Sequence, residues 1–571
     1  MFSLFLLSVI VLAVSPTAFS DDKVIVQTDC GPVRGKLFET LFDKRSYYAF
    51  KGIPYAEPPV NKLRFKPPKP KQPWTDTLDA FEFGNVCSQN IFLFGKRSPA
   101  GSEDCLFLNI YTPDVSAESK RTVMLFIHGG GFLEGSGNDN FYGPDFFINE
   151  DVVLVTLNYR LGVFGFMSLG TPEYSGNMGL KDQNLAIKWI QNNIEQFGGD
   201  PDKITVFGHS AGACSTHYHV LSSKSNSLFK RAIAMSGSAL NIWSHYVPRE
   251  HMLHMFMIAN MAGQRLSTSK DLIEFINTVD AKFFLENIDT TISLGSGRKE
   301  LELLWAPVIE GKNAKKPFIQ MSPEDILDNK FNHKIDTMFG FTSAEMLFLI
   351  ADEIHDTKLL EAFEQTFEVQ LTKKKMDTRY ETEEYKKFAN EIRNFYFGED
   401  GHVSNETLVE YNDLLSDVFI VHGIDKSAKA HSKGKSFYYR FSVDATLNAF
   451  KILFKLESVF GASHGDELCY LFRCHVFDEL YENIADDSVE MRTIRAVTKL
   501  WTNFAKFGDP TPNDEPISFK PIQKNLINFV DITNEGLIPA LGPHKKFMDF
   551  WTDIFGRYET HLVNSNVRDE L

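Results

Sequence analysis

A serine lies in the middle of a glycine-flanked run that follows a short apolar segment. The run is Gly208–Gly212 (GHSAG), with Ser210 at its centre, directly after Ile204–Phe207. Where a strand turns sharply into a helix, the residues two before and two after the turn are crowded, and glycine relieves that crowding. The pattern predicts a nucleophile at Ser210. The alternative is a purely structural turn, which the preceding strand disfavours.

A second glycine run lies at the end of another apolar segment. His128–Phe132 reads HGGGF and follows Val123–Ile127. Backbone without side chains can approach a substrate closely and present N–H donors to a negatively charged oxygen. Three glycines in a merely flexible turn would cost conformational entropy without benefit. We therefore expect an oxyanion hole formed by the backbone N–H groups of Gly130, Gly131 and Ala211.

A serine hydroxyl needs a base and an orienting acid to become nucleophilic. His464 stands in a glycine-flanked loop between apolar segments, where an imidazole can project. Glu345 lies four residues after the predicted strand Ile335–Phe341, where a carboxylate can face that imidazole. The residues alone do not separate Glu345 from Asp352 or Glu353 as the acid.

The elements that must position these residues alternate along the chain. Continuous apolar runs separated by helical segments are typical of a parallel sheet with both faces covered. The strand-like runs are Val24–Thr28, Tyr47–Ile53, Val123–Ile127, Val152–Tyr159, Ile204–Phe207, Ala232–Ser236 and Ile335–Phe341. Gly179–Phe197 has helical spacing and ends at two glycines, and residues 250–330 and 355–430 have the charged faces of amphipathic helices. We expect an α/β fold, with a large mixed, mostly parallel central sheet flanked by helices and a helical cap.

The composition limits the class of function. The 571 residues include 59 basic and 75 acidic side chains, a net charge of −16, and 43% are hydrophobic. A hydrophobic content this high, together with the balance of basic and acidic residues, excludes a disordered chain. A nucleic-acid partner is not expected, because a polyanionic surface repels phosphate. No stretch beyond residue 20 has the 18 or so apolar residues of a membrane span, so none is expected.

Both ends of the chain resemble targeting signals. Residues 1–20 are apolar from Phe2 to Val14 and end in Ala18–Ser20, the pattern of a cleaved signal peptide, with an uncleaved anchor as the alternative. The last four residues, 568–571 (RDEL), resemble the signal that returns proteins to the endoplasmic reticulum. We expect residues 21–567 to form a single catalytic domain with cap insertions. The expected location is the endoplasmic reticulum lumen, with the retrieval receptor as a partner and some secretion.

The cysteines and the glycosylation sequon add little chemistry. None of the 6 cysteines forms a CxxC pair or a Cys/His cluster with metal spacing, so no metal and no cofactor are expected. Asn405 begins the sequon Asn-Glu-Thr and is a predicted glycosylation site on an exposed segment.

The motifs resemble those of the type-B carboxylesterase and cholinesterase family of α/β-hydrolases, most of all its insect-type α-esterases. Phe197–Gly212 matches the family's serine signature and Glu103–Ile110 (EDCLFLNI) matches its second signature. The similarity reaches from Phe50–Ala56 to Trp501–Ala505. The resemblance implies Ser210 as nucleophile, Glu345 as acid, His464 as base, a disulfide between Cys87 and Cys105, and Trp243 in the acyl pocket.

Departures from the family pattern narrow the substrate. Residues 88–104, the loop closed by that disulfide, contain no tryptophan, so the cation–π site for quaternary ammonium is missing. His209 precedes the nucleophile where cholinesterases have Glu, which removes a charge that attracts cations. Choline esters are therefore poor candidates. The family's second disulfide is also absent, and we expect free thiols at Cys30, Cys214, Cys469 and Cys474, with a Cys469–Cys474 pair left open.

The expected function is hydrolysis of uncharged, mainly apolar carboxylic esters through an acyl-enzyme. The alternatives are a non-enzymatic binding or adhesion module, and stoichiometric sequestration of organophosphates or other ester xenobiotics. The 51 phenylalanines suggest an apolar substrate gorge under the cap, with Phe132, Phe341 and Phe348 in its lining. The sequence determines neither the physiological ester nor the oligomeric state.

Overall fold

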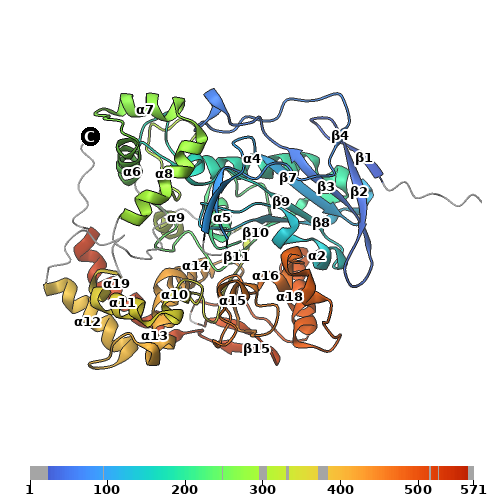
Figure 1. Cartoon of the computed structure of the whole chain (residues 1–571). Coiled ribbons are helices and arrows are strands. Elements are labelled where there is room, and N and C mark those ends of the chain that lie inside the picture. Colours follow the sequence, from blue (N-terminus) through green and yellow to red (C-terminus); the bar gives the residue numbers. More distant parts are fainter. Residues whose placement is uncertain are drawn as a thin grey trace, which may run out of the picture.

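The computed structural model describes residues 23–93, 96–246, 248–294, 305–329, 334–370, 383–513, 516–524 and 526–563. The predicted signal peptide, residues 1–20, and the predicted retrieval signal, residues 568–571, lie outside the described residues. Figure 1 shows the middle strands of the sheet in the interior of the molecule with helices beside them, and the N-terminal strands, in blue, at its right edge.

Thirteen strands form one sheet, whose order is β1-β2-β3-β7-β9-β8-β10-β11-β12-β13-β14-β15, with β4 paired to β2. The strands from β9 to β14 are parallel, and antiparallel pairs flank them on both sides. Strands β5 and β6 form a separate hairpin. The bounds are β1 Lys23–Gln27, β2 Pro32–Glu39, β3 Ser46–Pro54, β4 Leu78–Asp79, β5 Gln89–Leu93, β6 Lys96–Ala100, β7 Phe107–Thr112, β8 Arg121–Ile127, β9 Val153–Leu157, β10 Gly199–His209, β11 Arg231–Met235, β12 Asp336–Thr342, β13 Ser436–Phe441, β14 Asn528–Thr533 and β15 Gly536–Leu541.

The predicted mixed, mostly parallel sheet is confirmed, and each predicted apolar run coincides with a strand. The sequence pattern did not single out β13 and β14, which extend the parallel part of the sheet beyond β12.

Strand β8 shows why its apolar run has no polar positions. Val123, Leu125 and Ile127 pack into one hydrophobic core, and Met124 and Phe126 pack into the core on the other face. Successive side chains of a strand point to opposite faces, so a strand covered on both sides is apolar at nearly all positions.

Helices flank the sheet, as expected. The flanking helices are α1 Asp139–Tyr142, α2 Asp145–Asn149, α3 Gly162–Phe166, α4 Met178–Asn193, α5 Ala211–Leu221, α16 Leu468–Leu471, α17 Asp478–Tyr481 and α18 Val489–Phe507. The remaining helices are α6 Pro248–Met261, α7 Ser269–Thr278, α8 Ala281–Leu294, α9 Pro323–Asn329, α10 Ala351–His355, α11 Thr357–Gln370, α12 Glu383–Phe397, α13 Leu408–Ser416, α14 His422–His431, α15 Ala449–Phe454 and α19 Lys545–Val563. Figure 1 shows α6, α7 and α8 gathered at the upper left and α11, α12 and α13 at the lower left, near α19. No helix within the described ranges combines the length and the apolar character that a membrane span needs.

The cysteines pair twice. The disulfide between Cys87 and Cys105 is confirmed. A second disulfide joins Cys469 to Cys474, so the expectation of free thiols was wrong at these two positions. Cys469 lies within the short helix α16, which ends at Leu471, and Cys474 lies three residues beyond that end, with 5.4 Å between the two Cα atoms. Cys30 and Cys214 are free and buried, as expected.

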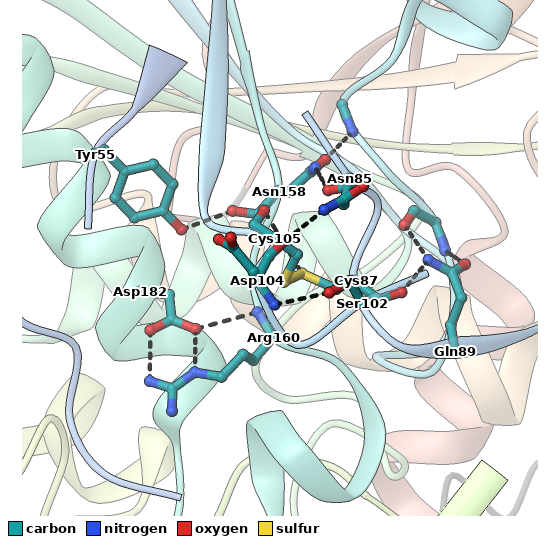
Figure 2. Close-up of a disulfide and its surroundings, with 12 residues drawn as sticks. Tyr55, Asn85, Cys87, Gln89, Ser102, Asp104, Cys105, Asn158, Arg160 and Asp182 are labelled. Carbon is teal, nitrogen blue, oxygen red and sulfur yellow. Dashed lines mark hydrogen bonds and ion pairs between the residues drawn. A yellow bond between two sulfur atoms is a disulfide. The ribbon is translucent and has the colours of Figure 1, made fainter. Parts of the chain in front are cut away.

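A buried ion pair joins α4 to the segment after β9. Arg160 donates to both carboxylate oxygens of Asp182, from Nε at 2.7 Å and from Nη2 at 2.6 Å. Figure 2 shows this pair beside the Cys87–Cys105 disulfide. Their side chains are 3% and 0% exposed, so loss of either partner leaves the other charge without solvent or a counterion.

We expect Asp182→Asn to lower the free energy of unfolding by about 3–5 kcal/mol, because an uncompensated guanidinium stays buried. Urea denaturation measures the change. Asp79→Asn is the matched control, since Asp79 pairs with Arg34 at 2.6 Å but is 52% exposed. The control should lose less than about 1 kcal/mol. Equal losses in the two variants would contradict the role assigned to burial.

Candidate active site

Ser210 stands at the turn from β10 into α5, with φ 57° and ψ −123°. L-residues rarely adopt this backbone conformation, and it persists only where the surroundings enforce it. A Cβ added at Gly208 would lie 2.4 Å from the carbonyl oxygen of Gly212, and a Cβ at Gly212 would lie 2.0 Å from the carbonyl oxygen of Ile127. Both positions therefore require glycine, as the GHSAG pattern predicted.

The glycine run at 129–131 lies directly against this turn. A Cβ added at Gly129 would lie 3.0 Å from Ser210 Cβ. Gly130 and Gly131 have φ of 99° and 60°, a region that favours glycine. The structure thus brings the two glycine-rich segments together beside Ser210, at the carboxyl ends of the adjacent strands β8 and β10.

Glu345 and His464 form a buried pair. His464 Nδ1 lies 2.6 Å from Glu345 Oε2, and the side chains are 8% and 0% exposed. Glu345 Oε1 accepts a hydrogen bond from the Thr342 backbone N–H at 2.7 Å. Asp352 and Glu353, which the sequence left as alternatives, lie on α10, and Glu345 is the carboxylate in contact with the imidazole. A proton on Nδ1 is shared with Glu345, which leaves Nε2 as the basic nitrogen.

The His464 loop is fixed by hydrogen bonds along its backbone. All four N–H groups from Gly461 to His464 donate to a defined acceptor. The acceptors, in chain order, are Asp444 Oδ2 at 3.0 Å, Ser343 Oγ at 3.0 Å, Asp466 Oδ2 at 2.6 Å and the Glu345 carbonyl at 3.2 Å. Two of these acceptors belong to the segment that carries Glu345, so acid and base are positioned together.

Asp466 ties this loop to the start of α15. It is fully buried, and its carboxylate also accepts from the backbone N–H groups of Phe450 at 2.9 Å and Lys451 at 3.2 Å. Burial raises its pKa to about 7, against the lowering effect of the hydrogen bond from Ser463 and of those from α15. Sequence reasoning missed this role because the contact joins loop residues to a helix start that only folding brings near.

Burial shifts the pKa of two ionisable groups beside this pair. The centroid of the His209 ring lies 4.5 Å from that of the His464 ring. Burial, and to a smaller extent the charge of His464, lowers the pKa of His209 well below 6.5. Burial, and to a smaller extent the charge of Glu345, raises the pKa of the Glu467 carboxyl well above 4.5. Burial therefore favours the uncharged form of both side chains.

The aromatic residues predicted to line a substrate site have different surroundings. The Phe348 ring stacks on the His464 ring with 5.3 Å between the centroids, and the ring centroids of Phe132 and Trp243 are 6.3 Å apart. Phe341 instead packs on Tyr438 at 5.6 Å and on His544 at 5.7 Å. Other phenylalanines stack on one another in the core, among them Phe126, Phe207 and Phe472. Core packing thus explains part of the phenylalanine content that the sequence suggested for a gorge.

In the part of the chain that the structure describes, no three His, Cys, Asp or Glu side chains are arranged to hold a metal ion. The predicted glycosylation site, Asn405, is exposed and begins a short 3₁₀ helix, Asn405–Thr407.

Comparison with known proteins places this geometry in a family. The profile of the "Carboxylesterase family" matches residues 22–551. The chain belongs to the carboxylesterase family. This carboxylesterase-family chain is 31% identical over 549 residues to esterase B1 of Culex pipiens, with 94% of this chain and 98% of that protein covered. It is 35% identical over 503 residues to a carboxylic ester hydrolase of Bombus ignitus, with 86% of each chain covered.

A solved structure of the family has the same fold. The crystal structure of juvenile hormone esterase from Manduca sexta, with OTFP covalently attached, aligns with a TM-score of 0.81 at 26% sequence identity. The alignment covers 94% of this carboxylesterase-family chain and all of that one. The α/β-hydrolase fold expected from the sequence is therefore confirmed.

Proposed function

We propose that this chain is a serine carboxylesterase that hydrolyses uncharged, mainly apolar carboxylic esters through an acyl-enzyme. The observation that carries the proposal is the 2.6 Å contact between the buried Glu345 carboxylate and His464 Nδ1, beside the strained turn at Ser210. A buried carboxylate on one imidazole nitrogen makes the other nitrogen a general base.

In acylation, His464 Nε2 removes the hydroxyl proton of Ser210 as Oγ attacks the ester carbonyl carbon. The carbonyl oxygen becomes an oxyanion, which accepts hydrogen bonds from the N–H groups of Gly130, Gly131 and Ala211. The imidazolium is stabilised by Glu345 and then gives its proton to the departing alkoxide, which leaves as the alcohol. In deacylation, water attacks the acyl carbon while His464 takes a proton from it. His464 then returns the proton to Ser210 Oγ as the bond between Oγ and the acyl carbon breaks, which frees the carboxylic acid and restores the Ser210 hydroxyl.

The surroundings of His464 support an uncharged substrate. His209 is kept neutral by burial and by His464, and Phe348 covers the imidazole with an apolar ring. Trp243 and Phe132 offer aromatic surface for an acyl chain. The loop at residues 88–104 holds no tryptophan that could bind a quaternary ammonium group.

The proposed location is the endoplasmic reticulum lumen. It is supported by the apolar residues 1–20 and by the RDEL sequence at 568–571, which a retrieval receptor would bind. Glycosylation at Asn405 is consistent with that location, because its side chain lies on an exposed segment.

We expect Ser210→Ala to lower hydrolysis of a p-nitrophenyl ester by about four orders of magnitude or more, since the nucleophile is lost. Steady-state kinetics and labelling by a fluorophosphonate measure the loss. Ser116→Ala, on an exposed serine whose side chain makes no capping bond, is the control. Unchanged turnover in Ser210→Ala would contradict the assignment. A single stoichiometric turnover by the wild-type protein would instead favour sequestration.

We expect His209→Glu to raise kcat/KM for acetylcholine relative to its uncharged carbon isostere, dimethylbutyl acetate, by about tenfold. A carboxylate beside the reacting centre attracts the cation through a partly dry medium, and about 1.4 kcal/mol corresponds to that factor. His209→Gln, which adds no charge, is the matched control and should leave the ratio unchanged. The same ratio in all three proteins would show that His209 does not face the substrate.

We expect Asp466→Asn to lower kcat by about 10- to 100-fold with little change in KM. Asparagine keeps one acceptor oxygen and replaces the other by an amide NH2 group, which then faces the N–H group of either Ser463 or Phe450. This loss of an acceptor costs about 1–3 kcal/mol and moves the His464 loop. Asp486→Asn, on a side chain that is 90% exposed, is the control. A rise in KM with kcat unchanged would contradict a positioning role for Asp466.

A further inference from the structure

The turn after the glycine run closes back on its own beginning. The Gly130 carbonyl accepts from the N–H groups of Leu133 at 2.9 Å and Glu134 at 3.0 Å, so residues 130–134 form one tight turn. Gly135 follows with φ 117°, and a Cβ there would lie 2.4 Å from His128 Nδ1. Gly135 packs on His128, the residue directly before Gly129. A shift of Gly135 would therefore shift the start of the glycine run.

Gly135 is held by one side chain, that of Gln89. Gln89 Oε1 accepts from the Gly135 N–H at 2.7 Å, and Gln89 Nε2 donates to the Gly135 carbonyl at 3.0 Å. Nε2 also donates to the Cys87 carbonyl at 2.8 Å. The side chain is only 3% exposed, so water cannot easily replace these bonds. Two antiparallel hydrogen bonds to a single residue fix both its position and its orientation.

The Cys87–Cys105 disulfide fixes the place from which Gln89 reaches. Figure 2 shows Gln89 close to this disulfide, with its hydrogen bonds drawn. Gln89 is the first residue of β5, two residues after Cys87, and Cys105 lies two residues before β7 of the central sheet. The Ser88 N–H also donates to the Ser102 carbonyl at 3.0 Å. The hairpin base that carries Gln89 is therefore tied covalently to the sheet.

The far end of the loop is anchored independently. The Gly137 N–H donates to Asn158 Oδ1 at 2.8 Å, and the Gly137 carbonyl accepts from Thr156 Oγ1 at 2.6 Å and Asn109 Nδ2 at 3.0 Å. Loss of Gln89 would thus loosen residues 129–135 and leave the chain beyond Gly137 in place.

We propose that Gln89 is a positioning residue for the oxyanion hole, acting through Gly135 from a base fixed by the Cys87–Cys105 disulfide. The inference rests on the proposed esterase function, in which Gly130 and Gly131 bind the oxyanion. Those N–H groups act on the negatively charged oxygen of the tetrahedral intermediate more than on the ester carbonyl. A loosened loop therefore weakens binding of the transition state and leaves binding of the substrate nearly unchanged.

The test compares Gln89→Ala and Gln89→Glu with the wild-type protein. Gln89→Ala removes both hydrogen bonds to Gly135. Gln89→Glu keeps the oxygen that accepts from the Gly135 N–H, but it places its second carboxylate oxygen against the carbonyl oxygens of Gly135 and Cys87. Both variants should lower kcat by about 10- to 100-fold with KM within about twofold. Gln320→Ala is the matched control, because Gln320 Nε2 also donates to a backbone carbonyl, that of Gly311, but on the surface.

A trifluoromethyl ketone provides the readout that a merely structural role would not change. Ser210 Oγ adds to the carbonyl carbon of the ketone and gives a hemiketal oxyanion in the same oxyanion hole. In the Gln89 variants, the inhibition constant of the ketone should therefore rise by the same factor by which kcat/KM falls. Inhibition by the product acid should stay unchanged. An unaltered constant for the ketone, or a rise in KM with kcat unchanged, would overturn the proposal. Thermal unfolding of each variant separates these outcomes from general loss of fold.

The disulfide offers an independent measurement. Cys87→Ser with Cys105→Ser should weaken trifluoromethyl ketone binding, and adding Gln89→Ala should then have little further effect, because both changes act through Gly135. Fully additive losses would contradict the proposed coupling. Hydrolysis that persists in Ser210→Ala would instead refute the proposed function, so failure of the function and failure of the Gln89 proposal are distinguishable.

Discussion

The backbone of Ser210 has to stay in a conformation that an L-residue rarely adopts, and the neighbouring segments are shaped to permit it. Gly208, Gly212 and Gly129 each lie where a side chain would collide with the turn or with β8. Because these close contacts join β8, β10 and α5, the turn is rigid. A serine on such a turn is presented to a substrate in one fixed direction, without the entropy loss that a flexible loop would suffer.

Around this turn, burial disfavours the charged form of two side chains. Glu345 is paired with His464 and with a backbone N–H, while burial raises the pKa of the Glu467 carboxyl and lowers the pKa of the His209 imidazole. In the proposed reaction, the ion pair forms between Glu345 and the imidazolium of His464. The aromatic rings of Phe348 and Trp243 add apolar surface and no charge, in agreement with an uncharged ester as substrate.

The sequence predicted strands β8 to β12, because a strand buried on both faces is apolar at nearly all positions. It also predicted the turn at Ser210, because only glycine fits beside that turn. Local pattern could not choose Glu345 over Asp352 or Glu353, since the choice depends on which carboxylate folding brings to His464. The contact of Asp466 with α15 was missed for the same reason, and the Cys469–Cys474 pair was left open while free thiols were expected. Phe341 was assigned to the substrate site on composition, whereas the structure packs its ring against Tyr438 and His544.

The central claim is that Ser210 carries the acyl group during hydrolysis. Rapid acid quenching during turnover of a p-nitrophenyl ester, followed by peptide mass spectrometry, measures this directly. The peptide that contains Ser210 should gain the mass of one acyl group, and the adduct should decay at the rate of product formation once substrate is consumed. Continued turnover with no adduct, or with the adduct on another residue, would contradict the claim.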